Sequence, residues 1–121
     1  MRVIIAGSRD ITDYNLVEEA VKESGITPTE IISGGARGVD RLGEQYAERN
    51  NLKCTVMPAD WHKYGKRAGY IRNDRMAENA DALIAVWDGK SKGTANMIGI
   101  ADHDYGLLIY VKRTDDETQY R

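Results

Sequence analysis

Cysteine and histidine are scarce in this chain of 121 residues, which contains one cysteine and two histidines. The single Cys54 excludes a disulfide within the chain and fits a reducing cytoplasm. It lies in an apolar run, where a cysteine more often serves as a small buried hydrophobic residue than as a nucleophile. Cys54, His62 and His103 do not have the spacing of a metal site, and no Ser/His/Asp or Cys/His catalytic arrangement can be argued. We therefore expect a cytoplasmic protein with no metal site and no required cofactor.

Long hydrophobic runs and a large excess of one charge are also missing. The apolar stretch at residues 1–7 is too short for a signal peptide or a membrane span, so we expect a first strand there and no membrane partner. The net charge of −2 provides no overall field to attract nucleic acid, which argues against a nucleic-acid partner. The length, with 41% apolar and 30% charged residues, fits one globular domain with one core.

Short apolar runs alternate with segments of helical spacing. The expected strands are 3–6, 30–33, 52–57, 82–87 and 107–111; the expected helices are 12–24, 39–50, 69–79 and 94–105, with an irregular segment at 59–68. This alternation is typical of βαβ units with right-handed crossovers. The sequence therefore predicts one α/β domain over residues 1–112, a Rossmann-like three-layer αβα fold. Its five-stranded parallel sheet should have the order 3-2-1-4-5, and a polar tail should follow at 113–121.

Two glycine-containing loops, at residues 33–40 and 88–94, connect predicted strands to predicted helices. A glycine turn lets the backbone approach an anion closely, and the helix that follows presents free N–H groups and a partial positive charge. Ligands of such sheets bind at the carboxyl ends of the strands where the strand order reverses, and residues 7–9 should lie at the same edge. Although each loop alone could be a simple tight turn, the pair favours a nucleotide-type ligand.

Neither loop matches a common phosphate-binding fingerprint. Residues 34–38, Gly-Gly-Ala-Arg-Gly, lack the spacing G-x-G-x-x-G of dinucleotide-binding proteins. Residues 89–91, Gly-Lys-Ser, imitate the end of a Walker loop, but Ile84 stands where that loop requires a glycine. This excludes an ATPase of the Walker type.

Cations and aromatic residues alternate over residues 60–75. The cations are Lys63, Lys66, Arg67, Arg72 and Arg75, and the aromatic residues are Trp61, Tyr64 and Tyr70. They could bind phosphate and stack on a base, or they could form a solvated basic surface. Arg72 and Asn73 are the favoured functional residues, because they lie near the start of a predicted helix. Asp40 also lies near a helix start, where it could cap the helix or accept hydrogen bonds from a ribose.

The motifs resemble those of a known superfamily. Residues 33–40, Ser-Gly-Gly-Ala-Arg-Gly-Val-Asp, resemble the SGGARGxD signature of DprA/Smf proteins. Residues 72–76, 80–85 and 93–94 resemble the Lonely Guy (LOG) proteins, which are nucleotide phosphoribohydrolases. Both belong to the SLOG superfamily, and the pattern over 59–94 resembles its small YspA-like, YpsA-related branch, often found in bacteria and phages. The resemblance implies a Rossmann-like fold, binding of nucleotides or their derivatives, and a homodimer or a higher homo-oligomer.

The resemblance to LOG enzymes breaks at one residue. Their loop Gly-Gly-x-Gly-Thr-x-x-Glu carries a catalytic glutamate, whereas Met97 stands at that position here. A methionine cannot move a proton or stabilise a developing positive charge as a carboxylate does. Arg72 matches an arginine that contacts substrate phosphate and ribose in LOG enzymes. The remaining candidates for catalysis are Arg72, Asp40 and Asp88.

We expect this protein to bind a nucleotide or a nucleotide derivative, such as ADP-ribose, NAD, a nucleoside monophosphate or a cyclic nucleotide, at the carboxyl edge of the sheet. The first alternative is an N-glycosidic bond hydrolase resembling LOG enzymes, and the second is DprA-like binding of single-stranded DNA. The predicted ligand-binding residues are Gly7, Ser8, Arg9, Gly34, Gly35, Ala36, Arg37, Gly38, Asp40, Trp61, Arg72, Asn73, Trp87, Asp88, Gly89, Ser91, Gly93 and Thr94.

Overall fold

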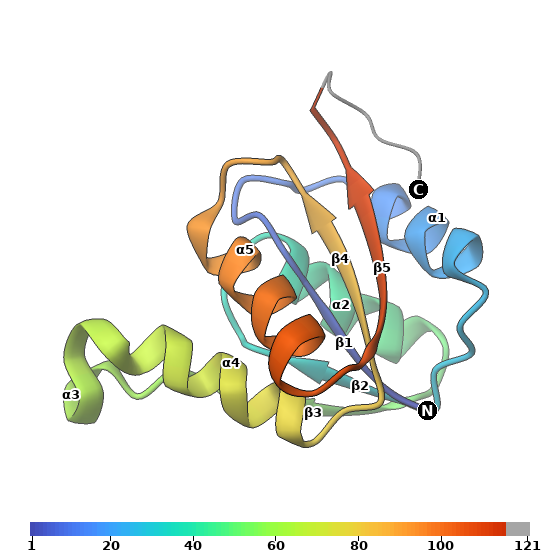
Figure 1. Ribbon diagram of the computed structural model, residues 1–121. Coiled ribbons are helices and arrows are strands. Elements are labelled where there is room, and N and C mark those ends of the chain that lie inside the picture. Colours follow the sequence, from blue (N-terminus) through green and yellow to red (C-terminus); the bar gives the residue numbers. More distant parts are fainter. Residues whose placement is uncertain (116–121) are drawn as a thin grey trace.

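Five parallel strands form the centre of the protein, which is described here by a computed structural model of residues 1–115 (Figure 1). The strands are β1 (Arg2–Gly7), β2 (Glu30–Ser33), β3 (Lys53–Val56), β4 (Ala82–Trp87) and β5 (Leu108–Arg113). Their order in the sheet is β3-β2-β1-β4-β5, and every neighbouring pair is parallel. The predicted α/β fold and strand order are confirmed. Residues 116–121, most of the predicted polar tail, lie outside the described residues.

Helices cover both faces of this sheet (Figure 1). They are α1 (Tyr14–Ser24), α2 (Val39–Arg49), α3 (Trp61–Tyr64), α4 (Ala68–Glu78) and α5 (Lys92–Gly99). Strand β1 directs Val3 and Ile5 into a core with α1 and α2, and Ile4 and Ala6 into a second core with α4 and α5. Because both faces of the central strands are buried, these strands are continuously apolar, as the sequence predicted.

Local signals explain where most helices begin and end. The Asp13 side chain accepts a hydrogen bond from the N–H of Asn15 at the start of α1, and Gly25 ends that helix with a left-handed φ of 71°. Ser91 caps α5 by accepting a hydrogen bond from the N–H of Thr94, so this helix begins at Lys92, two residues before the predicted start. A π-helical turn (Ile100–Asp104, η2) continues it.

The prediction of an irregular segment at 59–68 is wrong for residues 61–67. The Asp60 carboxylate accepts a hydrogen bond from the N–H of Lys63 and begins α3, and a 3-10 turn (Gly65–Arg67, η1) then leads directly into α4. None of the residues of α3 and η1 is buried. The segment therefore lacks the apolar stripe by which an amphipathic helix is predicted from sequence.

The reversal of strand order places a cleft at the carboxyl ends of β1 and β4. The chain leaves β1 toward α1 on one face of the sheet and leaves β4 toward α5 on the other face. The two connecting loops therefore separate at this edge, which is where ligands bind in open α/β sheets. Within residues 1–115, no helix combines the length and the apolar character that crossing a membrane requires.

Candidate nucleotide-binding site

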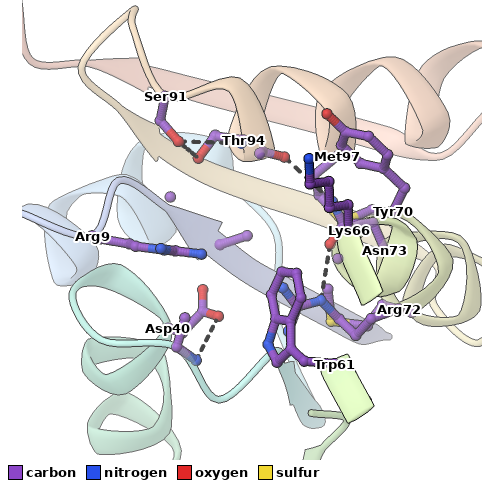
Figure 2. A pocket seen from close by; sticks show the side chains of 16 residues that line it. Arg9, Asp40, Trp61, Lys66, Tyr70, Arg72, Asn73, Ser91, Thr94 and Met97 are labelled. Carbon is purple, nitrogen blue, oxygen red and sulfur yellow. Dashed lines mark hydrogen bonds between the residues drawn. The ribbon is translucent and has the colours of Figure 1, made fainter. Parts of the chain in front are cut away.

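A pocket of about 190 Å³ opens between the loops at the carboxyl edge of the sheet (Figure 2). Segments that are far apart in the sequence meet there: the end of β1, the start of α2, the run from α3 to α4, and the start of α5. Ten of the residues predicted from sequence line it: Gly7, Arg9, Ala36, Asp40, Trp61, Arg72, Asn73, Ser91, Gly93 and Thr94. The structure thus brings the predicted loops together around one cavity.

Arg72 is fixed in this pocket by its own hydrogen bonds. Its guanidinium Nη1 donates to the carbonyl oxygen of Gly34 at 2.6 Å, and its Nε donates to Asn73 Oδ1 at 3.0 Å. The Asn73 amide in turn donates to Asn96 Oδ1 at 2.9 Å and to the Gly93 carbonyl at 3.3 Å. Burial lowers the pKa of Arg72. Asn73 therefore joins α4 to α5 and positions the arginine, which presents a preorganised cation.

Asp40 is the buried acid of the pocket, with 6% of its surface exposed. Its Oδ2 accepts a hydrogen bond from the N–H of Ala36 at 3.1 Å. Burial raises the pKa of Asp40 from its ordinary value of 3.8 to about 6, against the opposing effects of the Ala36 N–H and the charges of Arg72 and Arg9. The carboxyl thus bonds the loop before α2, and it can change its protonation state near neutral pH.

The loop after β4 is held by its own polar side chains. Asp88 Oδ1 accepts hydrogen bonds from the N–H groups of Lys90 at 2.8 Å and Ser91 at 2.9 Å, and these bonds lower the pKa of Asp88. The hydroxyl groups of Ser91 and Thr94 are hydrogen-bonded to each other at 3.0 Å and line the pocket (Figure 2). Asp88 therefore shapes the loop, while Ser91 and Thr94 face the cavity.

Eight predicted site residues do not line this pocket. They are Ser8, Gly34, Gly35, Arg37, Gly38, Trp87, Asp88 and Gly89. The buried Ser8 joins the loops, since its hydroxyl accepts from the N–H of Asp88 at 3.0 Å and its carbonyl accepts from the N–H of Val39 at 3.2 Å. The Trp87 indole donates to the Ser91 carbonyl at 3.1 Å. Of the two tryptophans predicted to stack on a base, Trp61 lines the pocket and Trp87 supports a loop.

Six lining residues were absent from the predicted set: Ala6, Lys66, Gly69, Tyr70, Met76 and Met97. Lys66, Tyr70 and Asn73 recur at helical spacing, so a helix extended toward the N-terminal side of residue 69 would have placed them on one face. Met76 and Met97 are almost fully buried and contribute apolar surface to the pocket. Met97, the residue that the resemblance matches to the LOG glutamate, lines this part of the pocket with apolar surface.

Positive charge dominates the pocket. Arg9, Lys66 and Arg72 surround it, and Asp40 is its one acidic lining residue (Figure 2). The side chains of Arg9 and Lys66 make no hydrogen bond or ion pair within residues 1–115. Trp61, which is 54% exposed as a residue, adds an indole ring. In the same part of the chain, no three His, Cys, Asp or Glu side chains gather closely enough to hold a metal ion.

The strand order and the pocket at its reversal point define a Rossmann-like α/β protein. The family model for the YspA, cpYpsA-related SLOG family matches residues 1–64. Gene 61 protein of Mycobacterium phage D29 is 34% identical over 105 residues, which cover 77% of this chain and 82% of the phage protein. This chain therefore belongs to the YspA, cpYpsA-related SLOG family.

A solved structure supports the fold assignment. The X-ray structure of DNA processing protein A (DprA) from Streptococcus pneumoniae superimposes with a TM-score of 0.74 over 95% of this chain. The sequence identity is 18%, and the match covers 51% of the DprA chain. This chain thus spans about half the length of DprA and shares the fold of that part.

Proposed function

We propose that this protein binds a nucleotide or a nucleotide derivative in the pocket at the carboxyl edge of the sheet. The observation that carries the proposal is the meeting of three cations, two hydroxyl groups and an exposed indole around one cavity. Arginine and lysine are the side chains that bind phosphate best, and the side chains of Arg9 and Lys66 make no hydrogen bond or ion pair within residues 1–115. The pocket therefore suits a ligand that combines phosphate with a flat apolar group.

Each part of such a ligand has a suitable partner. Phosphate would lie among Arg9, Lys66 and Arg72, near the N-terminus of α5, whose helix dipole favours an anion. The Asp40 carboxylate would accept hydrogen bonds from ribose hydroxyl groups. The base would stack on Trp61 and bury apolar surface of the ring.

The Arg9→Ala and Lys66→Ala variants should each bind the nucleotide about 5- to 30-fold more weakly than the wild type. Each removes one charged contact with phosphate, worth about 1–2 kcal/mol. Isothermal titration calorimetry with AMP, ADP, ADP-ribose, NAD and cyclic AMP measures this change directly. Without ligand, the thermal midpoint should stay constant for Lys66→Ala, because this lysine has no hydrogen bond or ion pair to lose within residues 1–115. It should fall slightly for Arg9→Ala, because the charge of Arg9 favours the buried carboxylate of Asp40.

Arg75→Ala and Lys22→Ala are matched controls, since these exposed cations lie in the last turns of α4 and α1, away from the pocket. Both should bind with wild-type affinity. Failure of every nucleotide to bind would overturn the proposal. Salt-sensitive binding of oligonucleotides alone would instead support the single-stranded DNA alternative. That alternative is favoured by the exposed rings of Trp61 and Tyr70 on the basic run from α3 to α4, and by the fold shared with DprA.

Asp40 favours one second candidate, hydrolysis of the N-glycosidic bond of the bound nucleotide. A buried acid with a pKa of about 6 can donate a proton to a leaving base near neutral pH while water attacks the sugar. This activity predicts free base appearing over time in chromatographic assays. Asp40→Asn should abolish that release, and the nucleotide should still bind, more weakly than to the wild type, because asparagine keeps one oxygen that can accept a ribose hydrogen bond but carries no proton to donate to the base. A nucleotide that binds but releases no base with the wild type would exclude this candidate.

A further inference from the structure

A second hollow of about 380 Å³ adjoins the pocket on the side of the loop that follows β1. It shares Arg9, Ser91 and Gly93 with the pocket, so the two spaces border each other along these three residues. Its other lining residues are Asp10, Arg37, Asp88 and Lys92. The proposed nucleotide site therefore has a second, charged hollow beside it.

Arg9 lies at the junction of the two spaces. Its side chain extends between Ser91, on the loop after β4, and Asp40, on α2 (Figure 2). The guanidinium forms no hydrogen bond or ion pair within the described part of the chain. The guanidinium of Arg9 thus keeps its N–H donors available beside both spaces, and these several donors can bind two phosphate groups at once.

The second hollow also provides its own cations. Lys92 forms no hydrogen bond or ion pair with any residue among 1–115. Arg37 is paired with Asp10 at 3.3 Å, but both side chains are largely exposed, so the pair is weak and can exchange for a ligand. Asp88 already accepts two N–H groups of its own loop. Counted together, the side chains around both spaces carry a net charge of +2 at pH 7, whereas the whole chain carries −2.

We infer that the two spaces together bind one ligand whose two halves are joined by a diphosphate, with the diphosphate at Arg9. This inference rests on the proposed nucleotide binding and names its ligand class: a dinucleotide or a nucleoside diphosphate sugar. The nucleoside half occupies the pocket beside Trp61. The second sugar occupies the adjoining hollow, where Arg37 and Lys92 contact the distal phosphate and hydroxyl groups.

The test compares ligands that differ only by the second half. Calorimetry is run with two pairs, AMP against ADP-ribose and UMP against UDP-glucose, so that a preference for one base does not hide the effect. For at least one pair, the diphosphate ligand should bind at least 10-fold more tightly to the wild type than the monophosphate. The double variant Arg37→Ala/Lys92→Ala should lose that advantage and still bind the monophosphate within twofold of the wild type.

Two further variants separate the inference from the proposed function. Lys66→Ala removes a cation of the pocket alone and should weaken both members of the pair equally. Lys90→Ala is the control, because this exposed lysine lies on the same loop as Lys92 but lines neither space. Equal affinity for monophosphate and diphosphate ligands, unchanged in the double variant, would overturn the inference and leave nucleotide binding intact. Failure of all four ligands to bind would overturn both.

Discussion

The Gly7→Ala variant is expected to lose at least about 3 kcal/mol of its free energy of unfolding, because the structure leaves no space for the methyl group of alanine. A Cβ atom on Gly7 would lie 2.0 Å from the carbonyl oxygen of Val86 and 2.8 Å from the side chain of Val39. Gly7 pairs with Val86 in the sheet, and the same Val86 oxygen accepts the N–H of Ser8 at 3.1 Å. The clash therefore involves backbone that the sheet holds in place. Urea denaturation of purified variants measures the loss.

Gly99→Ala is the matched control, since a Cβ there meets no atom within 4 Å and its φ of −61° suits alanine. It lies in α5, where alanine is preferred over glycine, so it should stabilise the protein by about 0.5–1 kcal/mol. Wild-type stability of Gly7→Ala would contradict the close approach of β1, β4 and the start of α2. Because Gly7 also lines the pocket, the close packing of β1 against β4 and α2 positions one wall of the candidate site.

The sheet and its long helices could be predicted because their residues are buried on regular faces. Alternation of apolar runs and helical stripes identified all five strands, and the spacing between them implied parallel crossovers. The caps Asp13 and Gly25 were also predictable, since each acts within three residues of itself. The α3 segment was not, because its stability depends on an Asp60 cap and not on burial.

The positions of the loops that form the candidate site could be predicted from the sequence, but which of their side chains face the pocket could not. Residues 88–94 were correctly placed at the carboxyl edge of the sheet, yet a polar residue in a loop can bond its own backbone or face a cavity. Asp88 bonds the amides two and three residues ahead, a turn that an Asp-Gly pair favours. Lys66 reaches the pocket on the turn at Gly65–Arg67, where an irregular segment was predicted, whereas Tyr70 lies in a helix that was predicted but its side chain was not among the predicted ligand-binding residues.

Asp40→Asn is expected to raise the free energy of unfolding at pH 7.5 by about 2–3 kcal/mol and to change it little near pH 4. The pKa of Asp40 is about 6 in the folded protein against an ordinary value of 3.8, and each unit of difference is worth about 1.4 kcal/mol. Between these two values the folded state binds more protons than the unfolded state, so this group's contribution to stability falls as the pH rises. Above pH 6 Asp40 is ionised in both the folded and the unfolded state, and the buried carboxylate lowers the free energy of unfolding by its full amount.

The asparagine keeps the oxygen that accepts the Ala36 N–H and removes the buried charge. Urea denaturation of both proteins from pH 4 to pH 8 should therefore give two stability curves that nearly coincide at pH 4, separate between pH 4 and pH 6, and stay a constant distance apart above pH 6. Asp10→Asn, at a largely exposed carboxyl, should change stability little at any pH. If Asp40→Asn were instead less stable at pH 7.5, the carboxylate would be needed to balance Arg72. A buried acid that lowers stability at neutral pH is typical of a functional site, where the chemistry of the ligand outweighs the stability of the free protein.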